Sequence, residues 1–313
     1  MINLSQPISI IVINWNAGVQ LRTCLNSIAQ YGSGLVAQTI VVDNGSLDGS
    51  DASVEGLPNV SLIRTGANLG FGKACNLGEQ KAQSDYLLFL NPDAALYSET
   101  LPKALAYMQD PANAKVGICG VQLLDECAHV SRSCTRFPSS VGFVVHAVGL
   151  DRVFPRLGYF MAEWDHEQTR RVDHVIGAFF LFRRAVFESL NGFDEHFFVY
   201  LEDLDLSYRA RQAGWSTVYL ANVQAFHAGG GTSNQVKARR LFYSLRSRLL
   251  YAFKHFSWLG AVGVLLATLL LEPVSRSALA LFRHSWSGLK ETWAAYGMLW
   301  RWLPQWILKG VTR

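Results

Sequence analysis

The sequence lacks several signals that would assign it to a common class of protein. Its five cysteines are odd in number and form no C-x-x-C pair, which predicts reduced thiols, a cytoplasmic compartment and no zinc site. Residues 1–7 contain neither a basic segment nor a long apolar run, so we expect no secretory signal. No G-x-G-x-x-G follows the first apolar segment, which argues against a nucleotide-binding oxidoreductase.

Charge is scarce and unevenly distributed. Charged residues make up 17% of the 313 residues and hydrophobic residues 50%, so the chain can bury a substantial core. Residues 236–313 hold 12 Lys/Arg and 2 Asp/Glu, which leaves 28 − 12 = 16 basic and 24 − 2 = 22 acidic residues in 1–235. A basic, apolar tail on an acidic body indicates an anionic lipid surface more than nucleic acid. A basic helical bundle with a solvated face is the alternative.

The tail has no long apolar run. Residues 258–271 carry no charge, but they are too few to span a bilayer comfortably and are followed by Glu272-Pro273. We therefore expect an interfacial, re-entrant or core helix there. Trp286, Trp293 and Trp300 are seven residues apart, which places them on one helical face. Aromatic residues flanked by Arg and Lys are typical of a membrane interface, although the core of a soluble helical hairpin remains open.

The first third of the chain alternates between strand and helix patterns. Apolar, β-branched runs predict buried strands at residues 8–14, 39–43, 60–64 and 86–90. Between them we expect a helix at 19–31 and a second helix that opens from the glycine-containing turn at 68–72 and runs to about residue 83. This is the βαβ pattern of a parallel sheet. Further strands are expected at 116–121, 175–182, 216–220 and 223–226, and helices at 101–108, 184–190, 202–212 and 236–256. Residues 127–170 show no clear periodicity and are expected to form a functional loop region.

Polar residues stand where the predicted strands end. Pro92 cannot continue a central strand, so Asp93 should lie just past the carboxyl end of strand 86–90. Ligands of open α/β sheets bind there, and a carboxylate can hold a divalent metal against a phosphate. Asp43 likewise follows a strand and can accept a hydrogen bond from a base or ribose. An Asx-Pro turn at 91–93 and a capping role for Asp43 are the structural alternatives.

Two further segments carry chemistry. Glu202, Asp203 and Asp205 lie at a helix start, where the helix dipole stabilises each by roughly 0.3–1 kcal/mol. Asp205 can also pair with Arg209. Three carboxylates exceed what capping requires, so one of them is a candidate general base. His227 ends a short strand before a glycine-rich loop and is a candidate metal ligand.

In this order, six segments resemble the motifs of glycosyltransferase family 2, the inverting enzymes with a GT-A fold. The segments are 8–16, 41–46, 68–78, 90–93, 192–206 and 226–231. The Asn-Pro-Asp form and the Gly-Gly-Gly-Thr-Ser ending are most similar to the rhamnosyltransferase branch that builds bacterial cell-surface glycans. The resemblance implies an α/β, Rossmann-like mixed sheet flanked by helices in residues 1–235. A helical, membrane-associating region is expected in 236–313.

The resemblance also implies roles for individual residues. Asp203 would be the catalytic base, Asp43 would bind the nucleotide base, and Asp93 and His227 would hold Mg²⁺ or Mn²⁺. The other expected contacts to the nucleotide sugar are Asn16, Asn44, Gly45, Asn68, Gly70, Asn76 and Asn91. The residues expected to meet the acceptor are Glu202, Gly177, Arg132 and Arg136. Since Asn91 replaces the first aspartate of the family's DxD motif, the metal would bind mainly as its nucleotide complex.

The function implied is transfer of a sugar from a nucleotide diphosphate to a hydroxyl group. The expected donor is dTDP-L-rhamnose and the expected acceptor is a polyprenyl-diphosphate-linked sugar. The enzyme would work at the cytoplasmic face of the bacterial inner membrane, on an anionic surface and without nucleic acid. A UDP- or GDP-hexose donor and a non-catalytic scaffold are the alternatives. The oligomeric state stays open.

Overall fold

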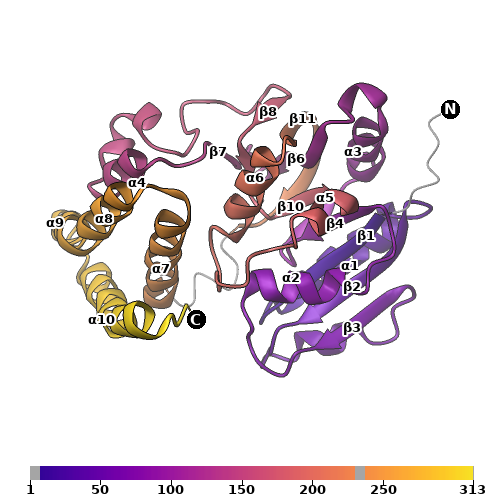
Figure 1. Cartoon of the computed structure of the whole chain (residues 1–313). Helices are drawn as coiled ribbons and strands as arrows, with labels where there is room; N and C mark the ends of the chain where they lie inside the picture. The colour runs from indigo at the N-terminus through magenta and orange to yellow at the C-terminus, as the bar shows by residue number, and fades with distance from the viewer. Residues whose placement is uncertain (1–7, 230–236, 313) are drawn as a thin grey trace. The chain divides into compact units, whose positions relative to one another are not determined.

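The computed structural model describes residues 8–229 and 237–312 (Figure 1). Two compact units divide the chain. The first unit comprises Met1–Thr135, Trp164–Glu195 and Asp203–Thr232, and the second comprises Arg136–Glu163, His196–Glu202 and Ser233–Arg313. Residues 136–163 and 196–202 thus belong to the unit formed by the C-terminal helices, although the chain reaches them before residue 235.

The first unit is built on a mixed sheet whose strands follow the order β3-β2-β1-β4-β10-β6-β11-β5, with β8 paired to β11. The strands predicted at the start of the chain are present as β1 (Ile8–Asn14), β2 (Val36–Asp43), β3 (Val60–Arg64) and β4 (Tyr86–Leu90). All four run parallel. The apolar side chains of β1 and β4 and of the second half of β2 are buried on both faces, as in a sheet covered by two helical layers, whereas the edge strand β3 is only partly buried.

The later strands make the sheet mixed. They are β5 (Ala94–Leu96), β6 (Val116–Leu124), β8 (Arg170–Val172), β10 (Phe179–Arg183) and β11 (Ser216–His227). Strand β10 lies antiparallel between β4 and β6, and β11 runs parallel to β6. The prediction of two strands at 216–220 and 223–226 was wrong, because the chain crosses Ala221–Asn222 as an irregularity within one strand. A two-stranded sheet joins β7 (Cys134–Thr135) to β9 (His174–Val175).

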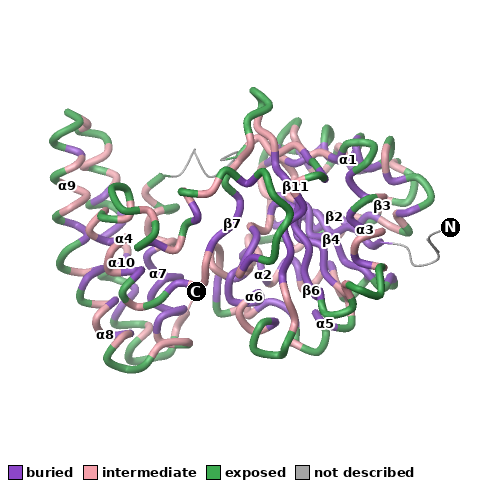
Figure 2. The backbone as a smooth tube through the Cα atoms, turned by 90° about the horizontal axis from the view of Figure 1, so that it is seen from above, coloured by how far each residue is buried: buried purple, intermediate pink, exposed green. Residues whose placement is uncertain are grey.

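Helices cover both faces of the large sheet. On one face, α1 (Val19–Tyr31) and α3 (Thr100–Gln109) pack their apolar residues against Ile10, Val12 and Leu88. On the other face lie α2 (Phe71–Glu79) and α5 (Arg184–Ser189), where Gly78 approaches Ile11 and Phe187 contacts Phe89. Helix α6 (Glu202–Gln212) and the short 3₁₀ helices η1 (Ser50–Val54) and η2 (Pro111–Asn113) complete this part of the chain. Figure 2 shows the central strands buried along most of their length.

The second unit is helical. Its elements are α4 (Ser140–Ala147), η3 (Leu150–Arg152), η4 (Pro155–Leu157), α7 (Lys237–His255), α8 (Trp258–Leu266), the π-helical turn η6 (Ala267–Leu271), α9 (Glu272–Phe282) and α10 (Trp286–Lys309). The expectation of an irregular loop over 127–170 was therefore partly wrong. Ser139 caps α4 by accepting a hydrogen bond from the Gly142 N–H at 3.0 Å, and the apolar Phe143 and Ala147 are buried.

The apolar segment of the tail is longer than the sequence predicted. A continuous helix runs from Trp258 to Phe282, 25 residues that are long and apolar enough to cross a membrane, with 33% of the most apolar window buried. We expected Glu272-Pro273 to interrupt it. Pro273 lacks an N–H, but it lies in the first turn of α9, and the wider π-helical turn before it shifts the hydrogen-bond pattern.

Glu272 explains why a charge is tolerated in this helix. Its carboxylate forms ion pairs with Arg248 of α7 and, at 2.7 Å, with Arg276, and the Arg248 and Glu272 side chains are almost fully buried. Burial alone would raise the pKa of Glu272, but the two guanidinium groups outweigh it and hold that pKa below its ordinary value. These three residues, the Glu272 triad, join α7 to α9, and the face of the long helix that carries Glu272 is therefore buried.

The opposite faces of these helices carry exposed apolar side chains. Along the long helix they recur at spacings of seven and four, and along α10 at a spacing of seven. The stripe on the long helix consists of Leu259, Leu266, Leu270, Val274 and Leu281. The stripe on α10 consists of Trp286, Trp293, Trp300 and Ile307. The common helical face predicted for the three tryptophans is thus confirmed, and the face is exposed.

The buried triad generates a stability prediction. Glu272→Gln keeps the size of the side chain but removes the charge that neutralises Arg248. Because breaking a buried pair leaves an uncompensated charge, we expect the free energy of unfolding to fall by about 3–5 kcal/mol. Urea unfolding followed by tryptophan fluorescence measures it, since six of the nine tryptophans lie beyond residue 257.

Glu188→Gln is the matched control, because it removes a carboxylate that pairs with Arg184 while 49% exposed. This exposed pair is worth less than about 1 kcal/mol. Equal losses in the two variants would show that the Glu272 triad contributes no more than a surface ion pair.

Candidate functional site

The carboxyl ends of the parallel strands bring the predicted site residues to one edge of the sheet. From β1 the chain proceeds outward to β2 and β3 and then returns to place β4 on the other side of β1. The crevice at such a reversal, beyond the ends of β1 and β4, is where open α/β sheets bind ligands. Asn14, Asp43 and Asn91 lie at the ends of β1, β2 and β4, and His227 ends β11.

The side chain of Asp43 is held by a hydrogen bond from Asn14 of the neighbouring strand β1. The Asn14 amide donates to Asp43 Oδ1 at 2.9 Å and to the hydroxyl of Ser50 at 2.8 Å, and the Ser46 N–H donates to Asp43 Oδ2 at 3.2 Å. Asn14 is fully buried and Asp43 is 5% exposed. Asn14 was not among the site residues expected from the sequence. The signal was an amide at the end of a strand whose other residues, apart from Ser9, are apolar.

The loops after β1, β2 and β3 are joined by asparagine side chains. Asn44 Oδ1 accepts the Leu69 N–H at 2.8 Å, and its amide donates to Asn68 Oδ1 at 3.1 Å. Asn16 Oδ1 accepts the Leu47 N–H at 2.7 Å. Gly45 has φ +77°, and an added Cβ would lie 2.7 Å from the backbone of Ala67. These contacts fix the shape of the rim predicted to bind the nucleotide.

Gly70 and Asn76 belong to the segment that begins α2. Gly70 precedes the helix with φ +86°, a conformation that side chains other than glycine rarely adopt, and its N–H donates to Asn68 Oδ1 at 2.9 Å. Asn76 Oδ1 accepts the Phe193 N–H and its amide donates to the Phe193 carbonyl, both at 2.9 Å. The Asn76 side chain therefore fixes the 192–195 turn against α2.

Asn91, Asp93 and His227, which the sequence named as candidate site residues, lie close together. Asp93 Oδ1 is 3.3 Å from His227 Nε2, and the Asn91 amide nitrogen is 3.5 Å from the same ring nitrogen. The His227 and Asp93 side chains are each 12% exposed. Strand β11 brings them together, because His227 pairs with Ala94 of β5. The remainder of the predicted glycine loop, residues 230–233, lies outside the described residues.

This donor set fits a divalent cation that takes most of its ligands from phosphate oxygens and water rather than from the protein. One carboxylate oxygen and one imidazole nitrogen suit Mn²⁺, and Mg²⁺ is commonly bound through one carboxylate plus phosphate oxygens and water. Asn91 adds an amide rather than a second charge. The arrangement therefore suits a metal that arrives with a diphosphate better than one bound by the protein alone.

Asp203 faces the same region of the first unit. Its Oδ2 accepts the Gly177 N–H at 2.9 Å and lies 3.6 Å from His174 Nε2, and its side chain is 20% exposed. A Cβ added to Gly177 would lie 3.3 Å from that oxygen and 3.8 Å from the Phe71 ring. Gly177 precedes Ala178, whose carbonyl accepts the Asn91 N–H at 3.0 Å. Asp203 and the Asn91–Asp93 segment are thus connected by hydrogen bonds to the adjacent residues Gly177 and Ala178.

His174 is a functional candidate that was not expected from the sequence. Its Nδ1 lies 3.1 Å from the Ser207 hydroxyl and its side chain is 4% exposed. Burial lowers the pKa of His174, against the opposing influence of Asp203 and Asp173, so the ring is held in its neutral form. No motif contains this residue, because its pairing with Asp203 depends on how α6 packs.

Of the other two carboxylates of the acidic segment, Asp205 is ion-paired and Glu202 is buried. Asp205 pairs with Arg209 at 2.8 Å, as predicted, and Arg209 also donates to the carbonyls of Leu190 and Gly192. Glu202 is 5% exposed. Asp203 is therefore the most exposed of the three.

The two arginines expected to meet the acceptor differ in their contacts. Arg136 forms an ion pair with Glu163, so its charge is already compensated. Arg132 is exposed and makes no ion pair with another described residue. The two arginines belong to different compact units, Arg132 to the first and Arg136 to the second.

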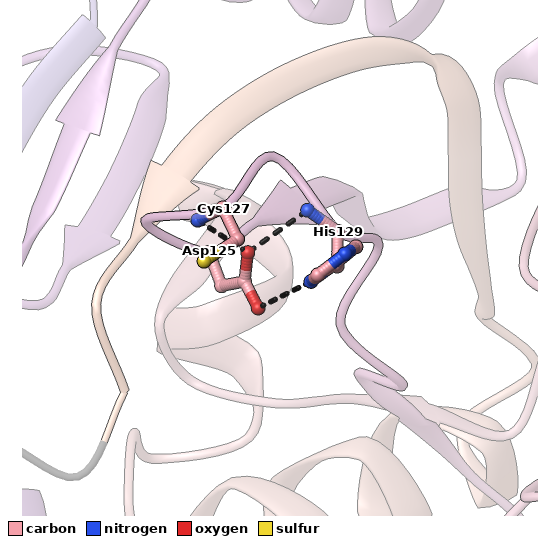
Figure 3. Close-up of side chains that lie close together, drawn as sticks. All are labelled: Asp125, Cys127 and His129. Atoms are coloured by element: carbon pink, nitrogen blue, oxygen red, sulfur yellow. Dashed lines mark hydrogen bonds and ion pairs between the residues drawn. The ribbon is translucent and has the colours of Figure 1, made fainter.

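A second group of possible metal ligands lies in an exposed turn after β6. Asp125, Cys127 and His129 bring their ligand atoms within 4.8 Å of one another (Figure 3). Asp125 Oδ1 accepts the N–H groups of Cys127 and His129, both at 2.8 Å. These N–H groups hold the pKa of Asp125 below its ordinary value. Because the turn geometry accounts for the carboxylate, the group does not by itself indicate a cofactor site.

Comparison with known proteins places this geometry in context. An N-acetylglucosaminyl-diphospho-decaprenol L-rhamnosyltransferase of Mycobacterium tuberculosis is 30% identical over 273 residues, covering 82% of this chain and 87% of that protein. The rhamnosyltransferase WbbL of Escherichia coli K12 is 31% identical over 173 residues, covering 52% of this chain and 61% of that protein.

Solved structures share the fold. The mannosyltransferase PcManGT from Pyrobaculum calidifontis, in complex with GDP-Man and Mn²⁺, aligns with a TM-score of 0.56 at 18% identity, over 94% of this chain and 87% of that one. S. aureus TarS 1–349 aligns with a TM-score of 0.55 at 16% identity, over 84% and 70%. The sheet and its helical layers are therefore those of GT-A glycosyltransferases, as the sequence predicted.

The sequence pattern of glycosyl transferase family 2 matches residues 9–190. This match covers more than half of the chain and includes the strand ends, the asparagine-linked loops and Asn91–Asp93. It excludes the oxidoreductase alternative. The chain belongs to glycosyl transferase family 2 and is a rhamnosyltransferase-like glycosyltransferase.

Proposed function

We propose that this protein is an inverting rhamnosyltransferase that uses dTDP-L-rhamnose and a polyprenyl-diphosphate-linked sugar acceptor. The observation that carries the proposal is Asp203, which is held by the Gly177 N–H beside a buried, neutral His174 at the same sheet edge as Asp93 and His227. The Mycobacterium tuberculosis relative supports the sugar and the acceptor class, because its name gives L-rhamnose and a diphospho-decaprenol substrate.

The donor is assigned to the loops after β1, β2 and β3. Asp43 receives the base or ribose, and Asn16, Asn44, Gly45, Asn68 and Gly70 form the surrounding rim. The cross-links between these loops favour binding because little conformational entropy remains to be lost. The same set of contacts holds Asp43 in place from β1 through Asn14.

Asn91, Asp93 and His227 are assigned to the diphosphate end of the donor. A bound Mg²⁺ or Mn²⁺ supplies charge neutralisation at the leaving nucleoside diphosphate. Asp93 and His227 are the residues that would hold this ion. Asn91, which replaces a carboxylate, adds no repulsion between the protein and the diphosphate.

Asp203 is assigned as the base that accepts the proton of the attacking hydroxyl. A single displacement with inversion needs one base and no nucleophile from the enzyme. The Gly177 N–H and the leucine N–H of residue 204 fix the orientation of the carboxylate. His174 Nε2 lies near Asp203 Oδ2, and because the ring is neutral it adds no positive charge beside the carboxylate.

The acceptor and the membrane belong to the same proposal. An isoprenoid-linked sugar is available only at a membrane, and the second unit presents exposed leucine and tryptophan stripes on a segment with an excess of basic residues. We assign the protein to the cytoplasmic face of the bacterial inner membrane, bound in the plane of the interface. Arg132, which is exposed, is the arginine that we retain as a contact to the acceptor diphosphate.

Two substitutions test the base. Asp203→Asn keeps the Gly177 contact but removes the proton acceptor, so turnover should fall by about 10²–10⁴-fold while nucleotide binding is retained. Gly177→Ala should lower turnover by displacing the carboxylate, and Gly297→Ala, where nothing lies within 4 Å, should not. Transfer of radiolabelled rhamnose to an isoprenoid-linked N-acetylglucosamine measures both effects. Unchanged turnover in Asp203→Asn would remove Asp203 from this role.

Thermal melts with dTDP, UDP and GDP, each with and without Mn²⁺, test the donor and the metal. A ligand at about 100 times its dissociation constant adds about 2.7 kcal/mol, so the bound nucleotide is visible as a shifted melt. We expect dTDP to stabilise most, with an increment from Mn²⁺ that Asp93→Asn loses. Asp125→Asn is the control for the exposed turn and should keep the increment. If Asp125→Asn lost the Mn²⁺ increment and Asp93→Asn kept it, the metal would be assigned to the Asp125 group. Stronger stabilisation by UDP or GDP than by dTDP would assign a UDP- or GDP-linked sugar as the donor.

The buried histidine generates a pH prediction. In the unfolded chain His174 binds a proton near its ordinary pKa of 6.5, whereas burial lowers its pKa in the folded protein. As the pH falls, the unfolded state is therefore protonated before the folded state and is stabilised relative to it. Stability should therefore be full above about pH 6.5 and fall below it, by up to about 1.4 kcal/mol per pH unit. His174→Gln should flatten this fall in urea titrations from pH 7 to 5. Parallel curves for the two proteins would contradict the assignment of a neutral ring.

A further inference from the structure

A pocket of about 320 Å³ lies within the second unit, among η3, the start of α7, α9 and the first turns of α10. Four of its lining residues are cations, namely Arg152, Lys237, Arg276 and Arg283. Glu291 is its one carboxylate. The pocket is formed by residues of one compact unit and contains none of the residues assigned to sugar transfer.

Three of the four cations have no carboxylate partner among the residues that the structure describes. Arg276 is committed to Glu272, but Arg152, Lys237 and Arg283 make no ion pair with another described residue. Several unpaired cations around one concave space repel one another, and an anion bound among them relieves that repulsion. Arginine is suited to this task because its planar donors match phosphate oxygens in pairs.

The start of α10 adds to the positive potential. Ser285 caps this 24-residue helix by accepting the Gly288 N–H at 3.2 Å, and both residues line the pocket. The N-terminus of a long helix carries a partial positive charge that favours anions. The helix end and the unpaired arginines therefore favour the same kind of ligand.

The residues beside the lining are apolar and exposed. Val153 and Phe154 follow Arg152, Phe282 precedes Arg283, and Trp286 follows Ser285, and each of these side chains is at least 56% exposed. Moreover, α9 and α10 are the helices that carry the exposed apolar stripes. A soluble anion would gain nothing from such a rim, whereas a lipid would bury its chains or glycerol backbone there while its phosphate occupies the pocket.

We propose that this pocket binds the phosphate head group of an anionic membrane phospholipid. The inference rests on the membrane association proposed above and gives it a specific site. Charge complementarity selects the phosphate, and the apolar rim together with the stripes selects a lipid that is already in a bilayer. The bound phospholipid would hold α9 and α10 at the interface with a defined rotation about their axes.

Flotation of the full chain on vesicles tests the pocket. Vesicles of phosphatidylcholine are compared with vesicles that also contain phosphatidylglycerol. We expect Arg152→Gln/Arg283→Gln to lower partitioning onto the anionic vesicles by about 25-fold, from roughly fivefold for each arginine. Arg301→Gln/Lys309→Gln removes the same charge from exposed positions of α10 outside the pocket and should lower partitioning less than about fivefold.

Further arms separate the outcomes. Arg152→Lys/Arg283→Lys should restore most of the binding, and equal thermal melts of all variants exclude a folding defect. Equal losses of vesicle binding in the pocket variant and the control variant would overturn the proposed phosphate site but leave the proposed membrane association in place. No binding of the wild type to any vesicle would overturn both. Tight binding to vesicles with an isoprenyl diphosphate, but not to those with phosphatidylglycerol, would assign the pocket to an isoprenoid and overturn the phospholipid. Donor-induced thermal shifts should be unchanged throughout, since no transfer residue is altered.

Discussion

The arrangement of β1 between β2 and β4 is the constraint on which the first unit depends. Parallel pairing on both sides of β1 aligns the carboxyl ends of the strands. Because the strand order reverses at β1, the loops that follow β1 and β4 lead to opposite sides of the sheet and leave a crevice between them. Asn14 then joins the end of β1 to Asp43 across this edge. Every group assigned to the donor, the metal or the proton transfer lies at or beside this line of strand ends, so the chemistry depends on the register of the sheet.

The antiparallel strand β10 extends that line to the base. Its pairing with β4 carries Gly177 and Ala178 to the end of β4, where one backbone group meets Asn91 and another meets Asp203. Asp203 therefore receives its position from the sheet rather than from α6 alone. The second unit follows a different rule. Its long helix is ordered on one face by Glu272 and its two arginines and leaves the other face apolar and exposed.

Much of this arrangement was predictable from local sequence. The first four strands, α6 and the shared face of Trp286, Trp293 and Trp300 follow from periodicity, because buried faces impose it directly. The continuity of β11 and the passage of the long helix through Pro273 were not predictable. In both cases local signals favoured a break, and hydrogen bonds to neighbouring strands or a π-helical turn overrode them. His174 was missed because a single histidine has no periodicity.

The sequence by itself determined the family, the order of the strands and helices, and the residue types at each strand end. Those properties depend on local hydrophobic patterns and on motifs that are continuous in the chain. The tertiary structure alone decided which of three neighbouring carboxylates is held beside Gly177 and His174, which arginines are compensated, and which helix faces remain exposed. These outcomes depend on contacts between residues far apart in the chain, whose energies arise only when burial removes water from both partners.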